Sequence, residues 1–471
     1  TMMGIFTRAR SARHHFEKIL AGTAYTGTMT NTKHFNVHPG GQVKGRIRVP
    51  GDKSVSHRSI MLGALAQGTT HISGFLEGED AMATLQAFRD MGVVIEGPDD
   101  GKVVVHGVGL RGLQPPPGPL YVGNSGTTIR LMAGLMAGQK FDVELSGDVS
   151  LNKRPMERVA TPLRLMGAVV DTAEGGCPPM RIKGGQALQG IHYDLPMASA
   201  QVKSCVVLAG LYAQGRTSVT EPAPTRDHTE RMLKGFGYAV ERTSDTCAII
   251  GQGALIATDI DVPSDISSAT FFLVAAAICP ASDLVVEHVG MNPTRVGVIN
   301  ILRLMGADLT VLNEREVGGE PVADLHVKYS PLTGIRVPED QVPLAIDEFP
   351  ALMVAAACAS GTTTITGAEE LRVKESDRIQ AMVDGLKAMG VTIEGTTDGA
   401  IIQGMGPNQH FSSAQVVTHH DHRIAMAFTI AGLRADANIK ILDCAHVATS
   451  FPNFVELART VGMTLDEEFQ S

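Results

Sequence analysis

The sequence predicts an α/β protein built from six similar units, with helices inside and sheets outside. In each unit a helix ends on an apolar residue and a glycine, and a β-like run follows, as at Met91-Gly92-Val93. The six glycines, at positions 92, 167, 237, 306, 390 and 462, lie 75, 70, 69, 84 and 72 residues apart, so one unit is repeated along the chain. We expect each glycine to adopt the left-handed conformation that closes a helix.

A second feature of most units is an alanine-rich helix followed by a turn and an alternating strand. Residues 59–66, 268–275 and 350–357 are apolar on most sides of a helix, so we expect these helices to be buried. Residues 68–74 and 361–367 alternate as in a strand with one buried face. Two helices and several strands per unit indicate the α/β class.

Composition disfavours several classes of protein. The 471 residues are 44% hydrophobic and 19% charged, which is typical of a globular fold. A net charge of −9, with 4% aromatic residues and no tryptophan, disfavours a nucleic-acid partner. The longest apolar run, 271–279, is far shorter than the roughly 20 residues that cross a membrane, so we expect no membrane partner. The six cysteines form no C-x-x-C pair or zinc-like cluster, which predicts buried free thiols, no metal and a cytoplasmic location.

Residues 1–33 differ from the repeated units and form a separate N-terminal region. Residues 8–20 are basic and place apolar side chains on one helical face, and residues 22–32 are turn-prone, as in a linker. Three interpretations stay open: an organellar transit peptide, an expression remnant, or the tail of a larger protein. Because residues 8–20 resemble the end of prephenate dehydrogenase domains, the third interpretation predicts a fusion to such a domain.

Polar clusters precede apolar helices in the first half of the chain. Residues 50–58 place a glycine turn and then Lys53, Ser54 and Arg58 at a helix start, after an alternating strand at 43–49. Backbone N–H groups and the helix dipole make such a start an anion site. Residues 123–130, 150–156 and 197–201 are similar, and an Arg-Asp-His run follows at 226–228. Each cluster alone is also explained by ordinary helix capping.

The second half supplies carboxylates as well as cations. Asp347 and Glu348 come just before a buried helix, where Asp347 is equally well explained as an N-cap. Lys374 and Arg378 are four residues apart and would share one face if helical, which is also typical of a solvated surface. Residues 420–423 place four polar side chains before an apolar helix, a costly position without ligands.

Seven motifs, in order, resemble those of the 5-enolpyruvylshikimate-3-phosphate synthase family, class II. They are P-G-D-K-S-V-S-H-R (50–58), G-N-S-G-T-T-I-R (123–130), N-K-R-P-M (152–156), P-M-A-S-A-Q-V-K-S (196–204), I-D-E-F-P (346–350), L-R-V-K-E-S-D-R (371–378) and D-H-R-I-A-M-A-F (421–428). The resemblance runs from about residue 35 to residue 463. It implies a two-lobed inside-out α/β barrel of six βαβαββ-type repeats, with the active site in the cleft between the lobes. One lobe would be 51–263 (repeats 1–3), and the other 34–50 plus 264–471 (repeats 4–6).

The resemblance also implies a reaction and a set of site residues. The enzyme would transfer the enolpyruvyl group of phosphoenolpyruvate to the 5-hydroxyl of shikimate 3-phosphate and release phosphate through a tetrahedral intermediate. This transferase step belongs to the shikimate pathway, which leads to chorismate and the aromatic amino acids, and it implies no cofactor. Residues that would bind shikimate 3-phosphate are Lys53, Ser54, Arg58, Ser199, Ala200, Gln201, Arg226, Asp347 and Lys374. Those that would bind phosphoenolpyruvate are Lys53, Gly126, Arg154, Gln201, Arg378 and Arg423.

The resemblance to the family implies four catalytic residues in this chain. Asp347 would be the base for the 5-hydroxyl, Glu375 the proton donor to the methylene carbon, and Lys53 and Lys374 would assist; the division of roles between Asp347, Glu375 and Lys374 stays open. The chain departs from many class I members at 448–452, where it has no lysine, so that contact is left unassigned. Glyphosate-tolerant class II members have alanine at the position of Gly126, so we predict a glyphosate-sensitive enzyme.

Two alternative functions share features with this sequence. UDP-N-acetylglucosamine enolpyruvyl transferases share the unit architecture, but they usually carry a catalytic cysteine near the second unit, and here no cysteine precedes Cys177. A non-catalytic relative that acts as an interaction module would not need Lys53, Arg154, Asp347 and the other charged motif residues. The sequence therefore favours enolpyruvyl transfer to shikimate 3-phosphate over both alternatives.

Overall fold

The computed structural model describes residues 32–317 and 319–470, so the expected N-terminal helix and linker lie outside the described residues. The chain is a mixed α/β structure, as predicted. All six repeated glycines have positive φ, between 77° and 100°. Each follows the C-cap residue of a helix, so the predicted left-handed closing position is confirmed.

The first half of the described chain contains six helices and two short 3-10 turns. The helices and turns are α2 (Lys53–Leu65), α3 (Glu79–Asp90), α4 (Gly126–Ala137), η1 (Leu151–Lys153), α5 (Glu157–Leu165), η2 (Glu174–Gly176), α6 (Ala200–Gly210) and α7 (His228–Gly235). The strands are β1 (Thr32–Val37), β2 (Lys44–Ile47), β3 (Ala66–Ser73), β4 (Val94–Asp99), β5 (Lys102–Val108), β6 (Leu120–Tyr121), β7 (Val143–Ser146), β8 (Val169–Ala173), β9 (Cys177–Lys183), β10 (His192–Asp194), β11 (Arg216–Thr220), β12 (Glu241–Arg242), β13 (Thr246–Ile250), β14 (Leu255–Ile256) and β15 (Ile260–Asp261).

The second half repeats this pattern. Its helices and 3-10 turns are α8 (Ile266–Ile278), α9 (Gly297–Leu304), η3 (Glu339–Gln341), η4 (Pro343–Ala345), α10 (Phe349–Cys358), η5 (Glu369–Val373), α11 (Arg378–Ala388), α12 (His422–Gly432), η6 (Cys444–Thr449) and α13 (Phe454–Thr460). Its strands are β16 (Asp283–Gly290), β17 (Asp308–Val317), β18 (Glu320–Lys328), β19 (Ser360–Ile365), β20 (Thr392–Gly395), β21 (Ala400–Met405), β22 (Gln415–Val417), β23 (Ile439–Leu442) and β24 (Leu465–Gln470).

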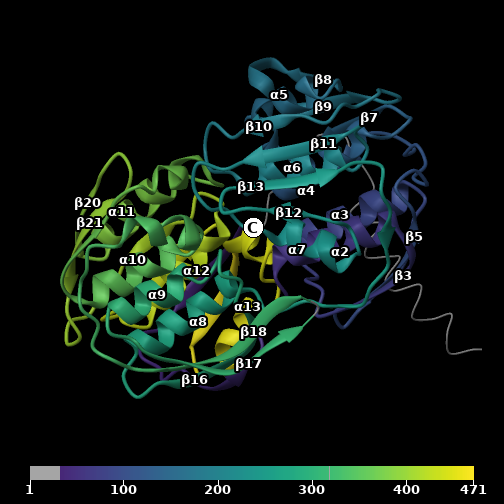
Figure 1. Ribbon diagram of the computed structural model, residues 1–471. Helices are drawn as coiled ribbons and strands as arrows, with labels where there is room; N and C mark the ends of the chain where they lie inside the picture. The colour runs from purple at the N-terminus through teal and green to yellow at the C-terminus, as the bar shows by residue number, and fades with distance from the viewer. Residues whose placement is uncertain (1–31, 318, 471) are drawn as a thin grey trace, which may run out of the picture.

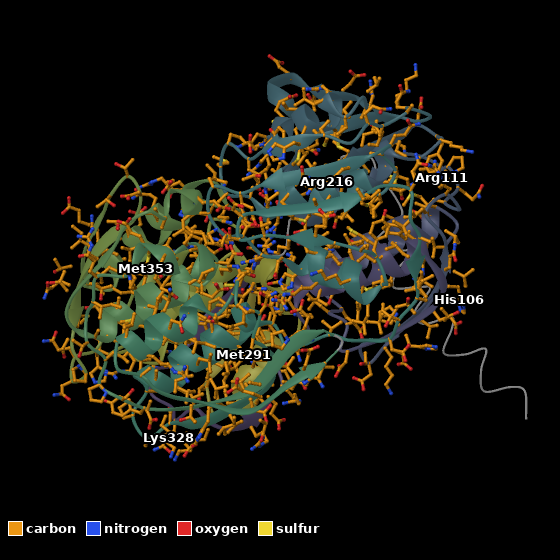
Figure 2. All side chains as sticks on the ribbon, in the orientation of Figure 1. His106, Arg111, Arg216, Met291, Lys328 and Met353 are labelled. Atoms are coloured by element: carbon orange, nitrogen blue, oxygen red, sulfur yellow. The ribbon has the colours of Figure 1, made fainter. Side chains whose placement is uncertain are left out.

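The strands form six small sheets. Their orders are β14-β3-β5-β4 with β15 beside β3, β6-β7-β9-β8, β10-β11-β13-β12, β17-β18-β16-β2, β19-β21-β20 and β22-β23-β1-β24. The N-terminal strands therefore join sheets of the second half: β1 runs antiparallel to β24 and β2 runs parallel to β16. Polar side chains cover the outside of these sheets, as Figure 2 shows at His106 on β5 and Lys328 on β18.

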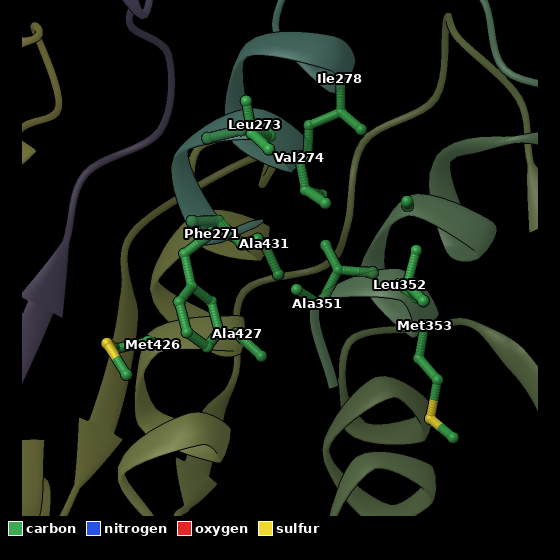
Figure 3. Packing of buried hydrophobic residues seen from close by; sticks show 14 of the residues in the cluster. Phe271, Leu273, Val274, Ile278, Ala351, Leu352, Met353, Met426, Ala427 and Ala431 are labelled. Carbon is green, nitrogen blue, oxygen red and sulfur yellow. The ribbon is translucent and has the colours of Figure 1, made fainter. Parts of the chain in front are cut away.

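The alanine-rich helices are buried, as expected from their composition. Every residue of α8 and α10 is buried, and both helices pack against α12. Figure 3 shows this contact, with Phe271 on α8 near Ala427 and Ala431 on α12, and Ala351 on α10 beside Ala431. Small alanines let the three helices approach closely, so they fill the interior while the sheets lie outside.

The buried hydrophobic side chains fall into two clusters. One gathers Phe35 to Val49 with Ile266 to Leu465, and the other gathers Val55 to Val262. In Figure 1 the purple-to-teal elements α2 to α7 and the green-to-yellow elements α8 to α13 accordingly lie on opposite sides. We propose that these clusters are the cores of two lobes, with boundaries at 51–263 and at 34–50 plus 264–471.

The two connections between the clusters lie side by side. Gly51 and Ser264 form an antiparallel bridge. The Asp52 N–H donates to the Pro263 carbonyl at 2.7 Å, and the Asp265 N–H donates to the Pro50 carbonyl at 2.9 Å. The paired connections bring the starts of α2 and α8 together, although the two helices are more than 200 residues apart in sequence.

Two details differ from the local sequence expectations. Asp347 is not the N-cap of its helix, because Glu348 occupies that position. The expectation that Lys374 and Arg378 share one helical face is wrong: Lys374 has an extended backbone after η5, and Arg378 is the first residue of α11. The Asp377 side chain caps α11, and this cap begins the helix after Lys374.

Candidate active site

The first residues of the central helices meet at one cleft, whose cavity volume is about 180 Å³. It is lined by the beginnings of α2, α4 and α6 from one half and of α8, α10 and α12 from the other. Side chains cap five of these helices directly, at Asp52, Ser125, Ser199, Asp265 and Asp421. The N-terminal ends of helices attract negative charge, so the cleft favours anionic ligands.

The structure brings together every predicted site residue except Arg58. The cleft is lined by Lys53, Ser54, Gly126, Arg154, Ser199, Ala200, Gln201, Arg226, Asp347, Lys374, Glu375, Arg378 and Arg423. Arg58 lies behind this lining, with its guanidinium bonded to the Ser54 carbonyl at 2.9 Å, Thr229 Oγ1 at 2.7 Å and Ser204 Oγ at 3.0 Å. Here Arg58 supports the helix turn that carries Ser54, and its direct contact with substrate stays a prediction.

Asp347 is surrounded by cations. Arg226 Nη2 contacts its Oδ2, Arg378 Nη1 donates to its Oδ1 at 3.0 Å, and Lys374 Nζ lies 3.5 Å from Oδ1. Arg423 Nη1 donates to the Asp347 carbonyl at 3.2 Å. Although burial acts to raise it, these four cations hold the pKa of Asp347 well below its usual range. Asp347 is therefore ionised at neutral pH in this state.

Glu375 is the second carboxylate of the cleft. Arg378 Nη2 donates to Glu375 Oε2 at 2.6 Å, and Arg154 Nη1 lies 3.5 Å from Oε1. Burial acts to raise its pKa, but Arg378 and Arg154 hold it well below the usual range. Beneath the cleft, Arg378 Nε donates to Asp421 Oδ2 at 2.8 Å, and this fixes the guanidinium between the two acids.

Lys53 begins α2 at the junction of the two halves. Its ammonium pairs with Asp80 on α3, and its backbone N–H donates to Asp265 Oδ2 at 3.1 Å. The side chain is about one-fifth exposed, so Lys53 is both paired and accessible from the cleft. A ligand that binds Lys53 must therefore compete with the Asp80 carboxylate.

Sequence reasoning missed several charged residues that line the cleft. They are Asp80, Arg130, Arg158, Asp265, Arg295, Glu370 and His422. Arg130 ends the motif at 123–130, and Arg158 lies four residues after Arg154, so both carried a local signal. Arg295 belongs to none of the seven motifs, and no sequence pattern marks it.

Arg130 and Gln201 form a hydrogen-bonded pair beside Arg154. Arg130 Nη1 donates to Gln201 Oε1 at 2.6 Å, and Gln201 Nε2 donates to Thr127 Oγ1 at 3.1 Å. Burial first, and then the neighbouring Arg158 and Arg154, lower the pKa of Arg130 to about 9. Three arginines so close together repel one another, and a bound anion would relieve that repulsion.

The described residues contain no group of three or more His, Cys, Asp or Glu side chains placed to hold a metal ion. In the same part of the chain, no helix combines the length and the apolar character that a membrane crossing requires. All six cysteines are free, and five of them are buried.

Comparison with known proteins identifies the family. The family described as EPSP synthase (3-phosphoshikimate 1-carboxyvinyltransferase) matches residues 37–457. The 3-phosphoshikimate 1-carboxyvinyltransferase of Methylococcus capsulatus is 63% identical over 432 residues, 92% of this chain and 98% of the relative. That of Hydrogenovibrio crunogenus is 62% identical over 442 residues, 93% of this chain and 99% of the relative. The expected fusion to a prephenate dehydrogenase domain is not borne out by these relatives, which are matched over nearly their whole length.

Solved structures of similar fold point to the same family. EPSP synthase from Acinetobacter baumannii, solved at 2.37 Å, has a TM-score of 0.85 and 61% identity, covering 93% of this chain and all of that chain. The enolpyruvyl transferase NikO from Streptomyces tendae shares the fold, with a TM-score of 0.75 at 15% identity, covering 94% of this chain and all of that chain. The α/β fold class is thereby confirmed, and the chain belongs to the EPSP synthase family.

Proposed function

We propose that the chain is a 3-phosphoshikimate 1-carboxyvinyltransferase, which transfers the enolpyruvyl group of phosphoenolpyruvate to the 5-hydroxyl of shikimate 3-phosphate and releases phosphate. One observation carries this assignment beyond family membership. Nine cationic and five anionic side chains line the cleft, an excess of four positive charges in a chain whose net charge is −9. Both substrates carry a phosphate and a carboxylate, so this local excess matches them.

The positions of the cleft residues suggest which substrate each of them binds. We propose that shikimate 3-phosphate lies toward the starts of α2 and α6, where Lys53, Ser54, Ser199, Ala200, Gln201 and Arg226 line the cleft, and reaches Asp347 and Lys374. Phosphoenolpyruvate would lie between Lys53, Gly126, Arg154, Gln201, Arg378 and Arg423. The opposed positions of these residues in the two halves support a cleft that closes on both substrates and excludes water.

Substrate binding would change the state of the two acids. In the free enzyme, carboxylates occupy the cations that the substrates need: Asp347 holds Arg226 and Arg378, and Glu375 holds Arg154 and Arg378. A phosphate or carboxylate of substrate that pairs with these cations neutralises them. The pKa values of Asp347 and Glu375 then rise, which makes Asp347 a stronger base and allows Glu375 to carry a proton.

The reaction can then proceed in two balanced steps. Asp347 accepts the proton of the 5-hydroxyl, and the oxygen attacks C2 of phosphoenolpyruvate while Glu375 donates its proton to C3. The resulting tetrahedral intermediate has a methyl group and an intact bond from C2 to the phosphate oxygen. In the second step a methyl proton returns to Glu375, the C2–O bond to phosphate breaks, and Lys53 and Arg154 stabilise the departing phosphate. The proton on Asp347 leaves with the phosphate.

The pathway context and location follow from the reaction. We propose that the enzyme serves the shikimate pathway toward chorismate and the aromatic amino acids. A cytoplasmic location is supported by the six unpaired cysteines, because oxidising compartments favour disulfides.

The assignment is tested by measuring phosphate release from the purified chain with shikimate 3-phosphate and phosphoenolpyruvate together. Omission of either substrate is the control, and UDP-N-acetylglucosamine replaces shikimate 3-phosphate in a parallel reaction. We expect release only with the first pair, and a large loss in Asp347→Ala. No release from the unaltered enzyme, or release that depends on the nucleotide sugar, would overturn the proposed function.

A further inference from the structure

Arg295 is a buried guanidinium at the junction of the two halves. It lies in the turn between β16 and α9, and its side chain is only 3% exposed. Nη1 donates to Asp52 Oδ2 at 2.6 Å, and Nη2 donates to Asp265 Oδ1 at 3.2 Å and to Ser267 Oγ at 2.6 Å. Nη2 also lies 3.6 Å from Glu348 Oε1. One side chain therefore joins three carboxylates that are distant in sequence.

Each of these carboxylates begins a helix next to a proposed site residue. Asp52 is the N-cap of α2 and directly precedes Lys53. Asp265 is the N-cap of α8, and its other oxygen accepts the Lys53 backbone N–H at 3.1 Å. Glu348 is the N-cap residue of α10 and directly follows Asp347. The guanidinium of Arg295 therefore contacts the carboxylates of Asp52 and Glu348, the residues directly next to Lys53 and Asp347 in the chain.

Arg295 connects helices that belong to different hydrophobic clusters. Lys53 begins a helix whose apolar residues pack in the cluster from Val55 to Val262, whereas Asp347 precedes a helix that is buried in the other cluster. Between them, the chain connections at Gly51 and Ser264 pair through a single bridge. Arg295 ties both connections to the start of α10, so the distance from Lys53 to Asp347 is held by one planar, bidentate group.

We propose that Arg295 is a positioning residue: it holds the starts of α2, α8 and α10 together and thereby fixes Lys53 relative to Asp347. This inference rests on the proposed function of those two residues. The electrostatics support it, because burial alone would raise the pKa of Asp52, yet Arg295 first and His228 next lower it to about 2. Without Arg295, three carboxylates with exposed fractions of 6%, 9% and 1% would face one another unneutralised.

A matched control exists elsewhere in the chain. Lys203 is also a fully buried cation between two carboxylates, at 3.0 Å from Glu221 and 2.8 Å from Glu230, and it does not line the cleft. Substitution of Lys203 tests what the loss of any buried cation does to the protein. Substitution of Arg295 removes a buried cation at the junction of the two halves, so the comparison isolates the effect of that position.

The experiment compares the unaltered enzyme, Arg295→Met, Arg295→Lys and Lys203→Met by circular dichroism, thermal unfolding and phosphate-release kinetics. All kinetics are measured below the unfolding transition of the weakest variant. We expect Arg295→Met and Lys203→Met to lose thermal stability alike. Only Arg295→Met should lose kcat, by about 10²-fold, because a displacement of about 1 Å between reacting groups has an effect of that size. Arg295→Lys should recover part of kcat, since an ammonium keeps the charge but cannot bridge three helices.

The outcomes separate the inference from the function on which it rests. If the unaltered enzyme releases no phosphate, the proposed function fails. If the unaltered enzyme is active and folded Arg295→Met has the kcat of Lys203→Met, Arg295 is merely structural and the inference is overturned. If Arg295→Met does not fold, Arg295→Lys decides: a folded variant with kcat within twofold of the unaltered enzyme overturns the inference.

Discussion

Gly126 is the residue at which a single methyl group should change substrate recognition. It is the first residue of α4 and lies outside the left-handed region, so Gly126→Ala introduces no backbone strain. An added Cβ would lie 2.9 Å from Arg130 Nη1 and 3.2 Å from Arg154 Nη1. The perturbation therefore acts on the cleft and leaves the fold intact.

The magnitude follows from these distances. Ordinary contact begins at 3.4 Å, so Arg130 Nη1 must withdraw by about 0.5 Å and Arg154 Nη1 by about 0.2 Å. Arg130 Nη1 already donates to Gln201 at 2.6 Å, so its movement also shifts the Gln201 amide. A charge-assisted hydrogen bond is worth roughly 1.5–3 kcal/mol, and weakening one between Arg154 and phosphoenolpyruvate costs about 1.5 kcal/mol. The KM for phosphoenolpyruvate should rise about tenfold.

The assay is phosphate release at varied phosphoenolpyruvate, with and without glyphosate. The unaltered enzyme should be inhibited by micromolar glyphosate at low phosphoenolpyruvate, and Gly126→Ala should be tolerant, because the methyl group fills the space beside Arg154. Gly395→Ala is the matched control, since its Cβ would meet Val383 Cγ2 at a comparable 3.3 Å in β20, away from the cleft. Millimolar tolerance of the unaltered enzyme, or an unchanged KM in Gly126→Ala, would refute the reasoning.

Three further predictions concern the acids and the buried histidines. Asp347→Asn should lower kcat by roughly 10²–10⁴-fold in the phosphate-release assay, because the base is lost, and a change below threefold would contradict its role. In deuterated water the unaltered enzyme should incorporate deuterium into the C3 methylene, as observed by NMR, and Glu375→Gln should abolish this exchange; continued exchange would identify another proton donor. Burial lowers the pKa of His57 well below 6.5 and that of His422 to about 3. Below pH 6.5 the unfolded chain therefore binds more protons than the folded chain, and the free energy of unfolding must decrease as the pH is lowered. For His422 the loss of unfolding free energy should approach about 1.4 kcal/mol per pH unit as the pH falls from 6.5 to 5, and His57 should act in the same direction. Urea unfolding measures this loss, and a flat profile would contradict it.

The sequence by itself determined the repeated unit and most of the cleft. The glycine period was readable because a left-handed residue after a helix excludes almost every other side chain, and the structure confirms positive φ at all six positions. The motifs at 50–58, 123–130 and 371–378 were readable because anion binding at helix starts needs a local combination of glycine, hydroxyl and cationic residues. Such signals are contained within a few consecutive residues.

The tertiary structure alone decided how these segments pair. That Arg58 lies behind Ser54, that Glu348 rather than Asp347 caps α10, and that Lys374 leaves its expected helix depend on packing against distant segments. Arg295 carried no motif, because its partners at 52, 265 and 348 are brought to it only by the paired connections between the two halves. The residue types of a helix-start anion site are neighbours in the sequence and can be recognised there. The compensation of a buried charge depends instead on which remote carboxylates the fold brings into ion-pair distance. A single sequence does not specify those distances.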